Sequence, residues 1–161
     1  MNTDGSSQPR IKNTAAEEDG LSWSPNGSQH VVTAPSGLYY DLYVMDASPD
    51  STMTNITNLA DIDDEAPSWS DVSGIVFISD RDFDSDLDLF RAEIYTIDPD
   101  GSNPARVTTD GNSIAYRTPS WSPDGSKIVC GGLAGLYMMN ADGSGFMTID
   151  DGGSAYFPSW K

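Results

Sequence analysis

Hydrophobic residues in this chain occur in short runs separated by polar turns. The runs are rich in β-branched and aromatic residues and are bounded by Gly, Pro, Asp and Asn, which is typical of β-strands joined by tight turns. The 3.6-residue period of an amphipathic helix is absent from the sequence. The pattern therefore predicts an all-β protein.

The runs follow one repeated order. The motif Ser-Trp-Ser occurs at 22–24, 68–70 and 120–122, and Ser-Trp occurs again at 159–160. We predict that the first strand of each repeat ends at this Trp. Three more strands are predicted after each of the first three Trp residues. The second strands are 30–34, 75–79 and 128–131, the third are 42–46, 94–98 and 136–140, and the fourth are 54–57, 106–109 and 146–149. Four strands in a period of about 40 to 50 residues predict a β-propeller of four-stranded antiparallel blades.

The repeats divide a single predicted domain, residues 1–161, into three complete blades at about 18–58, 66–110 and 118–150. Two single strands flank them, at 9–13 and at 157–160. These would be the last and first strands of a split fourth blade whose middle strands are missing. Because unpaired strand edges promote association, we predict a partial ring or a ring completed by another chain.

The motifs of the repeat resemble a known family. The third blade reads Pro-Ser-Trp-Ser-Pro-Asp-Gly at 119–125 and Met-Asn-Ala-Asp-Gly-Ser at 139–144, and the second carries Glu-Ile-Tyr at 93–95. This is similar to the TolB-like (WD-like) β-propeller repeat. The resemblance implies a module that docks proteins, gates a serine peptidase or forms part of a polysaccharide lyase. It also favours a periplasmic or extracellular location, although no signal peptide is visible in residues 1–10.

The charge of the chain limits its partners. The 25 acidic residues outnumber the 8 Lys and Arg residues and give a net charge of -17. Such a chain repels nucleic acids and anionic membranes, and no apolar run approaches the ~18 residues of a membrane span. We expect a protein partner, or self-association through open blade edges, and neither nucleic-acid binding nor membrane insertion.

The acidic residues are also unevenly placed. In an antiparallel blade the loops between second and third strands, and those between blades, lie on one face of the disc. By this assignment that face receives 17 of the 25 acidic residues. The topology therefore predicts an acidic loop face that attracts cations.

Two acidic segments on this face are candidate metal ligands. Oxygen-rich clusters suit calcium, which accepts six to eight oxygen ligands. The loop at 80–88 has an aspartate at every second position, and Glu93 falls at position 12 of an EF-hand-like count from Asp82, although the repeat also places a glutamate there. The candidate ligands are Asp80, Asp82, Asp84, Asp86 and Asp88, together with Asp63, Asp64 and Glu65. Calcium is the candidate cofactor, and a solvated acidic loop is the alternative.

No set of catalytic residues emerges from the sequence. The single histidine, His30, lies in a predicted strand without a positioned nucleophile, and the single cysteine, Cys130, is expected to be a buried thiol. Trp23, Trp69 and Trp121 are expected in equivalent buried positions between blades. We expect a non-enzymatic binding or scaffold module. The alternative is a propeller domain or fragment of a larger enzyme, either a prolyl-peptidase-like hydrolase or a polysaccharide lyase.

Overall fold

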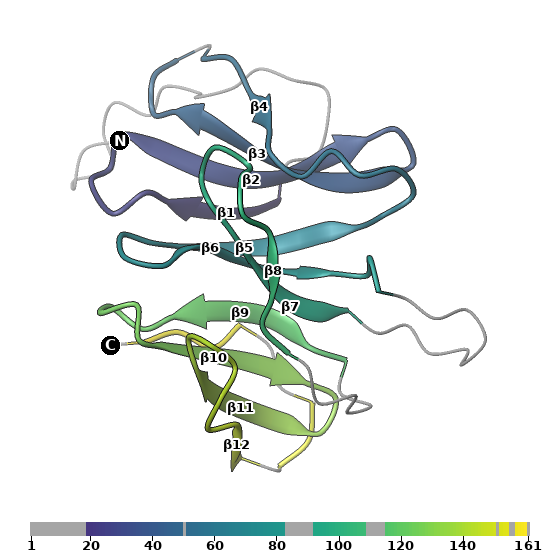
Figure 1. Cartoon of the computed structure of the whole chain (residues 1–161), viewed down its shortest axis with the longest axis vertical. Coiled ribbons are helices and arrows are strands. Elements are labelled where there is room, and N and C mark those ends of the chain that lie inside the picture. Colours follow the sequence, from purple (N-terminus) through teal and green to yellow (C-terminus); the bar gives the residue numbers. More distant parts are fainter. Residues whose placement is uncertain are drawn as a thin grey trace.

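The computed structural model describes residues 19–49, 51–82, 92–108, 115–150, 152–154 and 157–160. These residues form twelve β-strands in three four-stranded antiparallel sheets (Figure 1). Blade 1 contains β1 (Asp19–Trp23), β2 (Gln29–Ser36), β3 (Tyr39–Asp46) and β4 (Thr54–Asn55). Blade 2 contains β5 (Asp64–Ser70), β6 (Gly74–Ser79), β7 (Glu93–Ile97) and β8 (Ala105–Arg106). Blade 3 contains β9 (Arg117–Trp121), β10 (Lys127–Gly132), β11 (Gly135–Asn140) and β12 (Met147–Asp150).

The prediction of an all-β chain with three complete blades is confirmed. Each sheet pairs its strands in sequence order, and the first strand of a blade contacts the first strand of the next, β1 with β5 and β5 with β9. These three are the inner strands. The three sheets lie one after another along the long axis of the molecule, as an open segment of a ring (Figure 1). The described part of the chain contains no helix that is long and apolar enough to cross a membrane.

The hydrophobic core lies between the blades. One cluster joins blades 1 and 2 and includes Val31, Leu42 and Phe77, and a second joins blades 2 and 3 and includes Val76 and Cys130. Burial raises the pKa of the Cys130 thiol to about 12, so this side chain acts as a small hydrophobe, as expected. Each blade is therefore stabilised mainly by its neighbours.

The tryptophans occupy equivalent positions but differ in burial. Trp121 is 6% exposed in the cluster between blades 2 and 3, and Trp69 packs partly buried against the cluster between blades 1 and 2. Trp23 is 47% exposed, so the expectation that it is buried is wrong. Trp69 and Trp121 pack against residues of the preceding blade, whereas within the described ranges no sheet precedes blade 1.

The predicted terminal strands have different outcomes. Residues 9–13 lie outside the described residues. Residues 157–160 form no regular strand, but they lie along β9: the Phe157 N–H donates to Thr118 Oγ1 (2.9 Å) and the Trp160 indole donates to the Ser120 carbonyl (3.1 Å). This is the place of an inner strand of a following blade. The segment has no ladder because, among the described strands, none flanks it on its outer side.

The Asp-Gly turns after the third strands contact the preceding blade. Gly143 has φ 82, and a Cβ there would lie 2.1 Å from the carbonyl oxygen of Val107 in blade 2. Gly101 approaches the Ile56 carbonyl of blade 1 in the same way, at 2.9 Å. Glycine is therefore required for two reasons, the backbone conformation and the close approach of two blades.

We expect Gly143→Ala to destabilise the chain more than Gly27→Ala. Gly27 has a similar φ of 71 but nothing within 4 Å of its hypothetical Cβ. The Gly27 variant should lose about 1 to 2 kcal/mol from backbone strain, and the Gly143 variant about 1 to 3 kcal/mol more from steric overlap. Urea unfolding measures both values. Equal losses would show that blades 2 and 3 can move apart at this contact without a loss of stability.

Candidate functional site

The three inner strands share one irregularity. Each inner strand contains a β-bulge, in which one residue has no partner in the neighbouring strand. In β1, for example, Asp19 pairs with Thr33 and Ser22 pairs with Val31, so β1 has one residue more than β2 over this stretch. The extra residues stand three positions before each Trp and have positive φ: Gly20 (φ 59), Ala66 (φ 54) and Thr118 (φ 40). A bulge of this kind changes the direction of the side chains beside it. Phe157, three positions before Trp160, has the same backbone conformation (φ 53).

The residues on either side of the bulge have different roles. After the bulge, the residue directly before the Trp is a serine, and it links two blades. Ser22 Oγ accepts from the Trp69 N–H (3.0 Å), and Ser68 Oγ accepts from the Trp121 N–H (3.2 Å). The position before the bulge is charged in all three blades, as Asp19, Glu65 and Arg117. The serine holds the ring together, whereas the charged residue lies at the loop end of the strand.

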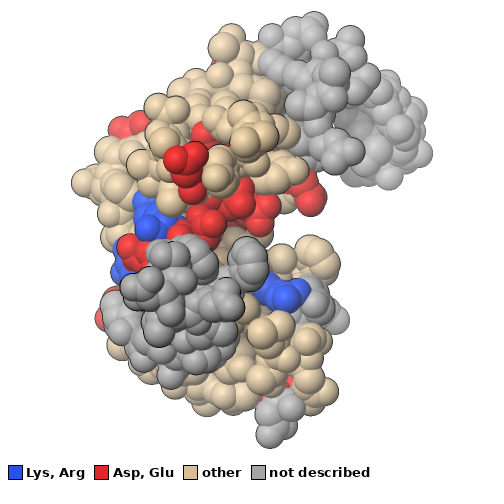
Figure 2. Space-filling view, turned by 90° about the vertical axis from the view of Figure 1, so that its right-hand side faces the viewer, with Lys and Arg blue, Asp and Glu red and all other residues tan. Residues whose placement is uncertain are grey.

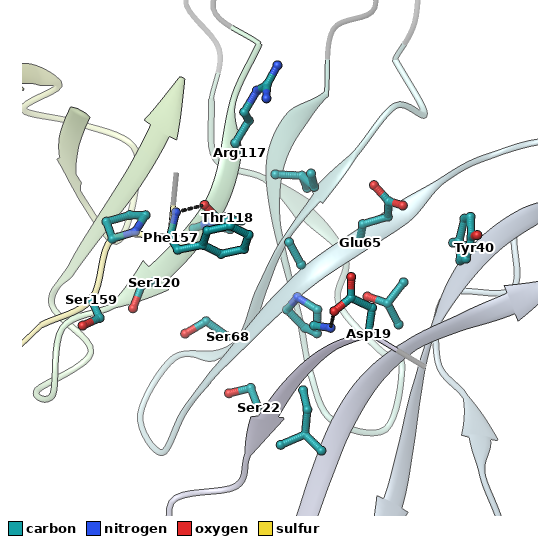
Figure 3. A pocket seen from close by; sticks show the side chains of 18 residues that line it. Asp19, Ser22, Tyr40, Glu65, Ser68, Arg117, Thr118, Ser120, Phe157 and Ser159 are labelled. Carbon is teal, nitrogen blue, oxygen red and sulfur yellow. Dashed lines mark hydrogen bonds between the residues drawn. The ribbon is translucent and has the colours of Figure 1, made fainter. Parts of the chain in front are cut away.

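A cavity of about 820 Å³, here named the axial pocket, lies along these bulges (Figure 3). Its wall consists of the residues before each Trp, 19–22, 65–68, 117–120 and 157–159, with Thr33, Tyr40 and Ile78. Figure 3 shows Asp19, Glu65 and Tyr40 on one side and Phe157 on the other. The pocket is therefore lined by the same positions of successive repeats and differs from blade to blade mainly in charge.

One end of the axial pocket is strongly acidic. We name Asp19, Asp63, Asp64, Glu65 and Asp80 the acidic mouth. The Asp63 N–H donates to Asp80 Oδ1 (2.8 Å), and Asp63 Oδ1 accepts from the Tyr40 N–H (2.9 Å). Burial, followed by the charges of Asp63, Asp19 and Asp80, raises the pKa of Glu65, and burial is also the main cause of the raised pKa of Asp80. Figure 2 shows acidic side chains gathered in the hollow of the molecule.

Arg81 neutralises one of these carboxylates. Its guanidinium pairs with Oδ1 of the fully buried Asp64 (2.9 Å), and its Nε donates to Ser79 Oγ (2.8 Å). The guanidinium also lies 4.4 Å from the centroid of the Tyr95 ring, a cation–π contact. Asp64 is therefore part of an internal ion pair rather than an exposed ligand.

The predicted metal ligands are only partly brought together. Asp63, Asp64, Glu65 and Asp80 share the acidic mouth, whereas Asp82 accepts from the Tyr95 hydroxyl and pairs with Arg106 (3.0 Å). Asp84, Asp86 and Asp88 lie outside the described residues. Within the described ranges, no three His, Cys, Asp or Glu side chains are grouped so as to hold a metal ion. Calcium at the 80–88 loop stays a prediction.

Besides Asp64, two more of the 17 acidic residues that the topology assigns to the loop face, Asp41 and Glu93, lie inside the blades. Glu93 is 5% exposed and pairs with Arg106 (2.7 Å), and Asp41 is 2% exposed and accepts from Asn55 Nδ2 (2.7 Å) and Thr57 Oγ1 (3.0 Å). Both carboxylates join the third strand of a blade to its fourth. Glu93 therefore has the structural role that the repeat gives it, and the acidic face is smaller than the topology alone predicts.

The acidic residues at the mouth of the axial pocket were predicted from the sequence, whereas the bulged wall of the pocket was not. The sequence pattern that could have indicated it is a contrast between two positions of the repeat. The residue directly before each of the first three Trp residues is Ser, whereas the fourth residue before them is Asp19, Glu65 or Arg117. A constant position beside a variable charged one is the pattern of a shared scaffold that carries a specific surface. Thr33 and Phe157, which also line the pocket, carry no comparable signal.

Comparison with known proteins agrees with this architecture. A putative TolB from Agrobacterium tumefaciens has 23% sequence identity and a TM-score of 0.74, and the match covers 89% of this chain and 52% of that one. The chain is also similar to a structure of a nidogen/laminin complex (15% identity, TM-score 0.64, 86% and 49% covered) and to the tricorn protease (17%, 0.59, 86% and 13%). The chain thus spans about half of the TolB structure, or less of the others. A search of curated proteins finds no match.

The match at the level of sequence families extends over almost the whole chain. The TolB beta propeller domain family matches residues 3–161, which include all three described blades and the 157–160 segment. This agrees with the four repeated Trp motifs and with the antiparallel order of the sheets. The chain therefore belongs to the TolB beta propeller domain family.

Proposed function

We propose that this chain is a non-enzymatic binding module whose acidic mouth engages a basic segment of a protein partner. One observation carries the proposal: Arg81 pairs with Asp64, whereas Asp19, Asp63, Glu65 and Asp80 form no ion pair with any described residue. Four carboxylates crowded beside a cavity repel one another, and a cationic partner would relieve that repulsion.

Two comparisons support the proposal. The TolB propeller family provides the scaffold, and a similar propeller comes from a nidogen/laminin complex, which is an assembly of two proteins. The open ends of the three-bladed segment offer further surface for a partner or for self-association. A periplasmic or extracellular location belongs to the same proposal and rests on membership of the family.

The second candidate function is the propeller part of a larger enzyme. Similarity to the tricorn protease, of which the match covers 13%, favours it, because there a propeller of this kind is a small part of a protease chain. A full-length reading frame that also encodes a hydrolase or lyase domain would support this candidate over the first.

Binding of deca-lysine tests the leading proposal. By titration calorimetry we expect micromolar binding in 20 mM NaCl and at least tenfold weaker binding in 200 mM NaCl, because salt screens exposed charges. The double variant Asp63→Asn/Asp80→Asn should weaken binding about tenfold while keeping its side-chain oxygens as hydrogen-bond acceptors.

A separate experiment tests calcium binding. If calcium chloride raises the melting temperature more than sodium chloride at the same ionic strength, the result supports calcium at the 80–88 loop.

The matched control for the deca-lysine experiment is Asp124→Asn/Asp142→Asn. It removes the same charge from exposed turns between first and second strands and between third and fourth strands, on the opposite face. The control should bind deca-lysine about as well as the parent chain. If both double variants lose affinity equally, deca-lysine senses only net charge and the acidic mouth is not a binding site.

A further inference from the structure

The turn between β1 and β2 contains the only Asn-Gly pair in the sequence, Asn26 and Gly27. In such a pair the backbone nitrogen of the glycine can attack the side-chain amide of the asparagine, because glycine has no Cβ to hinder the approach. Both residues are exposed, and the Gly27 N–H closes the turn by donating to the Ser24 carbonyl (2.8 Å). The turn therefore presents a side chain that is open to covalent modification.

The equivalent turn of blade 3 has the same sequence, except that aspartate replaces asparagine. Residues 24–28 read Ser-Pro-Asn-Gly-Ser, and residues 122–126 read Ser-Pro-Asp-Gly-Ser. Asn26 Oδ1 accepts from two serine hydroxyls and one backbone N–H, at 2.7 to 3.0 Å. Asp124 Oδ1 accepts from the equivalent three donors, at 2.6 to 3.0 Å. The turn of blade 1 can therefore hold an aspartate in place of Asn26.

The two turns differ in their surroundings. In blade 3, Gly125 is buried against blade 2: its carbonyl accepts from Ser73 Oγ (3.0 Å), and a Cβ there would lie 2.7 Å from Ser70 Oγ. Gly27 is exposed, and beyond its chain neighbours no atom of the described chain lies within 4 Å of its hypothetical Cβ. Because none of the described sheets precedes blade 1, its turn lacks the support that blade 2 gives to blade 3.

Deamidation of Asn26 requires this turn to open. The Gly27 nitrogen must leave its hydrogen bond to the Ser24 carbonyl, lose its proton and attack Cγ of Asn26. The new N–Cγ bond replaces the Cγ–Nδ2 bond, and ammonia leaves with the proton from Gly27. Water then adds to the cyclic imide, either at Cγ to give aspartate or at the backbone carbonyl carbon to give isoaspartate. Such local opening costs least where few contacts hold a segment.

We propose that Asn26 is a site of spontaneous deamidation in the folded chain, whereas the equivalent turn of blade 3 protects an asparagine from the same reaction. The aspartate product receives the hydrogen bonds that Asp124 receives, and these bonds, that of Ser122 Oγ first, lower the pKa of Asp124 to about 2. Isoaspartate adds a backbone carbon before Gly27 and cannot keep the hydrogen bond that closes the turn. The turn lies on the face opposite the acidic mouth, so this inference is independent of the proposed function.

The variant Asp124→Asn gives a matched comparison within one molecule. Its residues 24–28 and 122–126 have the same sequence, so the two sites share one intrinsic reactivity. After incubation at mildly alkaline pH, peptide mapping by mass spectrometry follows the replacement of the amide nitrogen by oxygen at each site. In the folded chain we expect deamidation at position 26 to be at least about tenfold faster than at position 124. In concentrated urea the two rates should agree within about twofold, because contacts between blades are lost.

Ser73→Ala tests the cause of the protection. Added to Asp124→Asn, it removes the hydroxyl that binds the Gly125 carbonyl. Deamidation at position 124 should become about threefold faster, the effect of one hydrogen bond, and the rate at position 26 should not change. The melting temperature of each variant establishes that the rates are compared in folded chains.

Two results would overturn the inference. Equal rates at positions 26 and 124 in the folded Asp124→Asn chain would show that blade 2 gives no protection. An Asn26 that reacts in urea but stays intact in the folded chain would show that the turn alone prevents the reaction. Asn26→Asp tests the product separately: it should raise the melting temperature at neutral pH, because hydrogen bonds to a charged acceptor are stronger, and a lower melting temperature would show that the turn does not accommodate aspartate.

Discussion

Replacement of Trp121 by alanine is expected to lower the free energy of unfolding by about 3 to 5 kcal/mol, the usual cost of removing a large buried aromatic side chain. Trp121 is 6% exposed and packs among residues of blades 2 and 3, so its loss leaves a cavity where two blades meet. Trp23→Ala removes the same side chain from the equivalent position of blade 1. Because Trp23 is 47% exposed, it should lose about 1 to 2 kcal/mol, and urea unfolding compares the two variants directly.

Trp121→Phe is the control for this comparison. The Trp121 indole nitrogen is buried without a hydrogen-bond partner, so phenylalanine removes a polar group that gains nothing from the fold. We expect Trp121→Phe to lose markedly less stability than Trp121→Ala. If Trp23→Ala proves as costly as Trp121→Ala, the exposure of Trp23 does not describe the folded chain in solution, and a further contact covers it there.

Removal of Arg81 should have an effect of similar size. Arg81→Met leaves the carboxylate of Asp64, which is 0% exposed, without its counter-ion, and breaking a buried ion pair in this way costs about 3 to 5 kcal/mol. The double variant Asp64→Asn/Arg81→Met removes both charges and should recover much of that loss. Unfolding in urea at neutral pH measures the single and double variants, and the difference gives the coupling between the two residues.

A second pair serves as a reference for Arg81. The Arg106–Asp82 pair is more exposed, at 32% and 42% of its side chains, so Asp82→Asn should cost less than about 1 kcal/mol. Equal losses for Arg81→Met and Asp82→Asn would show that the Asp64 carboxylate is hydrated in solution rather than buried.

The sequence predicts the blades well because their signals are local. The turns are rich in Gly, Pro, Asp and Asn, and the repeat places a Trp at or next to the end of the first strand of every blade. The observed bounds differ from the predicted ones by three residues at most, as β3 does by beginning at Tyr39 rather than Leu42. Strand order follows directly, since short turns join neighbouring antiparallel strands.

The candidate site is less predictable because its contacts connect distant residues. Charge counting placed Asp64 and Glu93 on a loop face, but their partners Arg81 and Arg106 lie 17 and 13 residues away and bring both carboxylates inside. The exposure of Trp23 likewise depends on what lies before blade 1, which no local pattern describes. Composition identifies an acidic chain, whereas only the fold identifies which carboxylates lack partners.

The bulges were equally hidden, because Ala66 and Thr118 are not residue types that favour a positive φ. Only Gly20 gives a local signal.

The bulge three residues before each Trp divides an inner strand into two segments with different structural roles. On the Trp side, Ser22 and Ser68 bind the next strand and cannot change without loosening the ring. On the other side, the residue at the position of Asp19 and Glu65 lies beyond the bulge and is tied to no such bond between blades. The residue at this position can therefore differ from blade to blade, as Asp19, Glu65 and Arg117 do, while the serine stays constant. For protein engineering, this position is therefore suited to substitutions that introduce a new binding specificity.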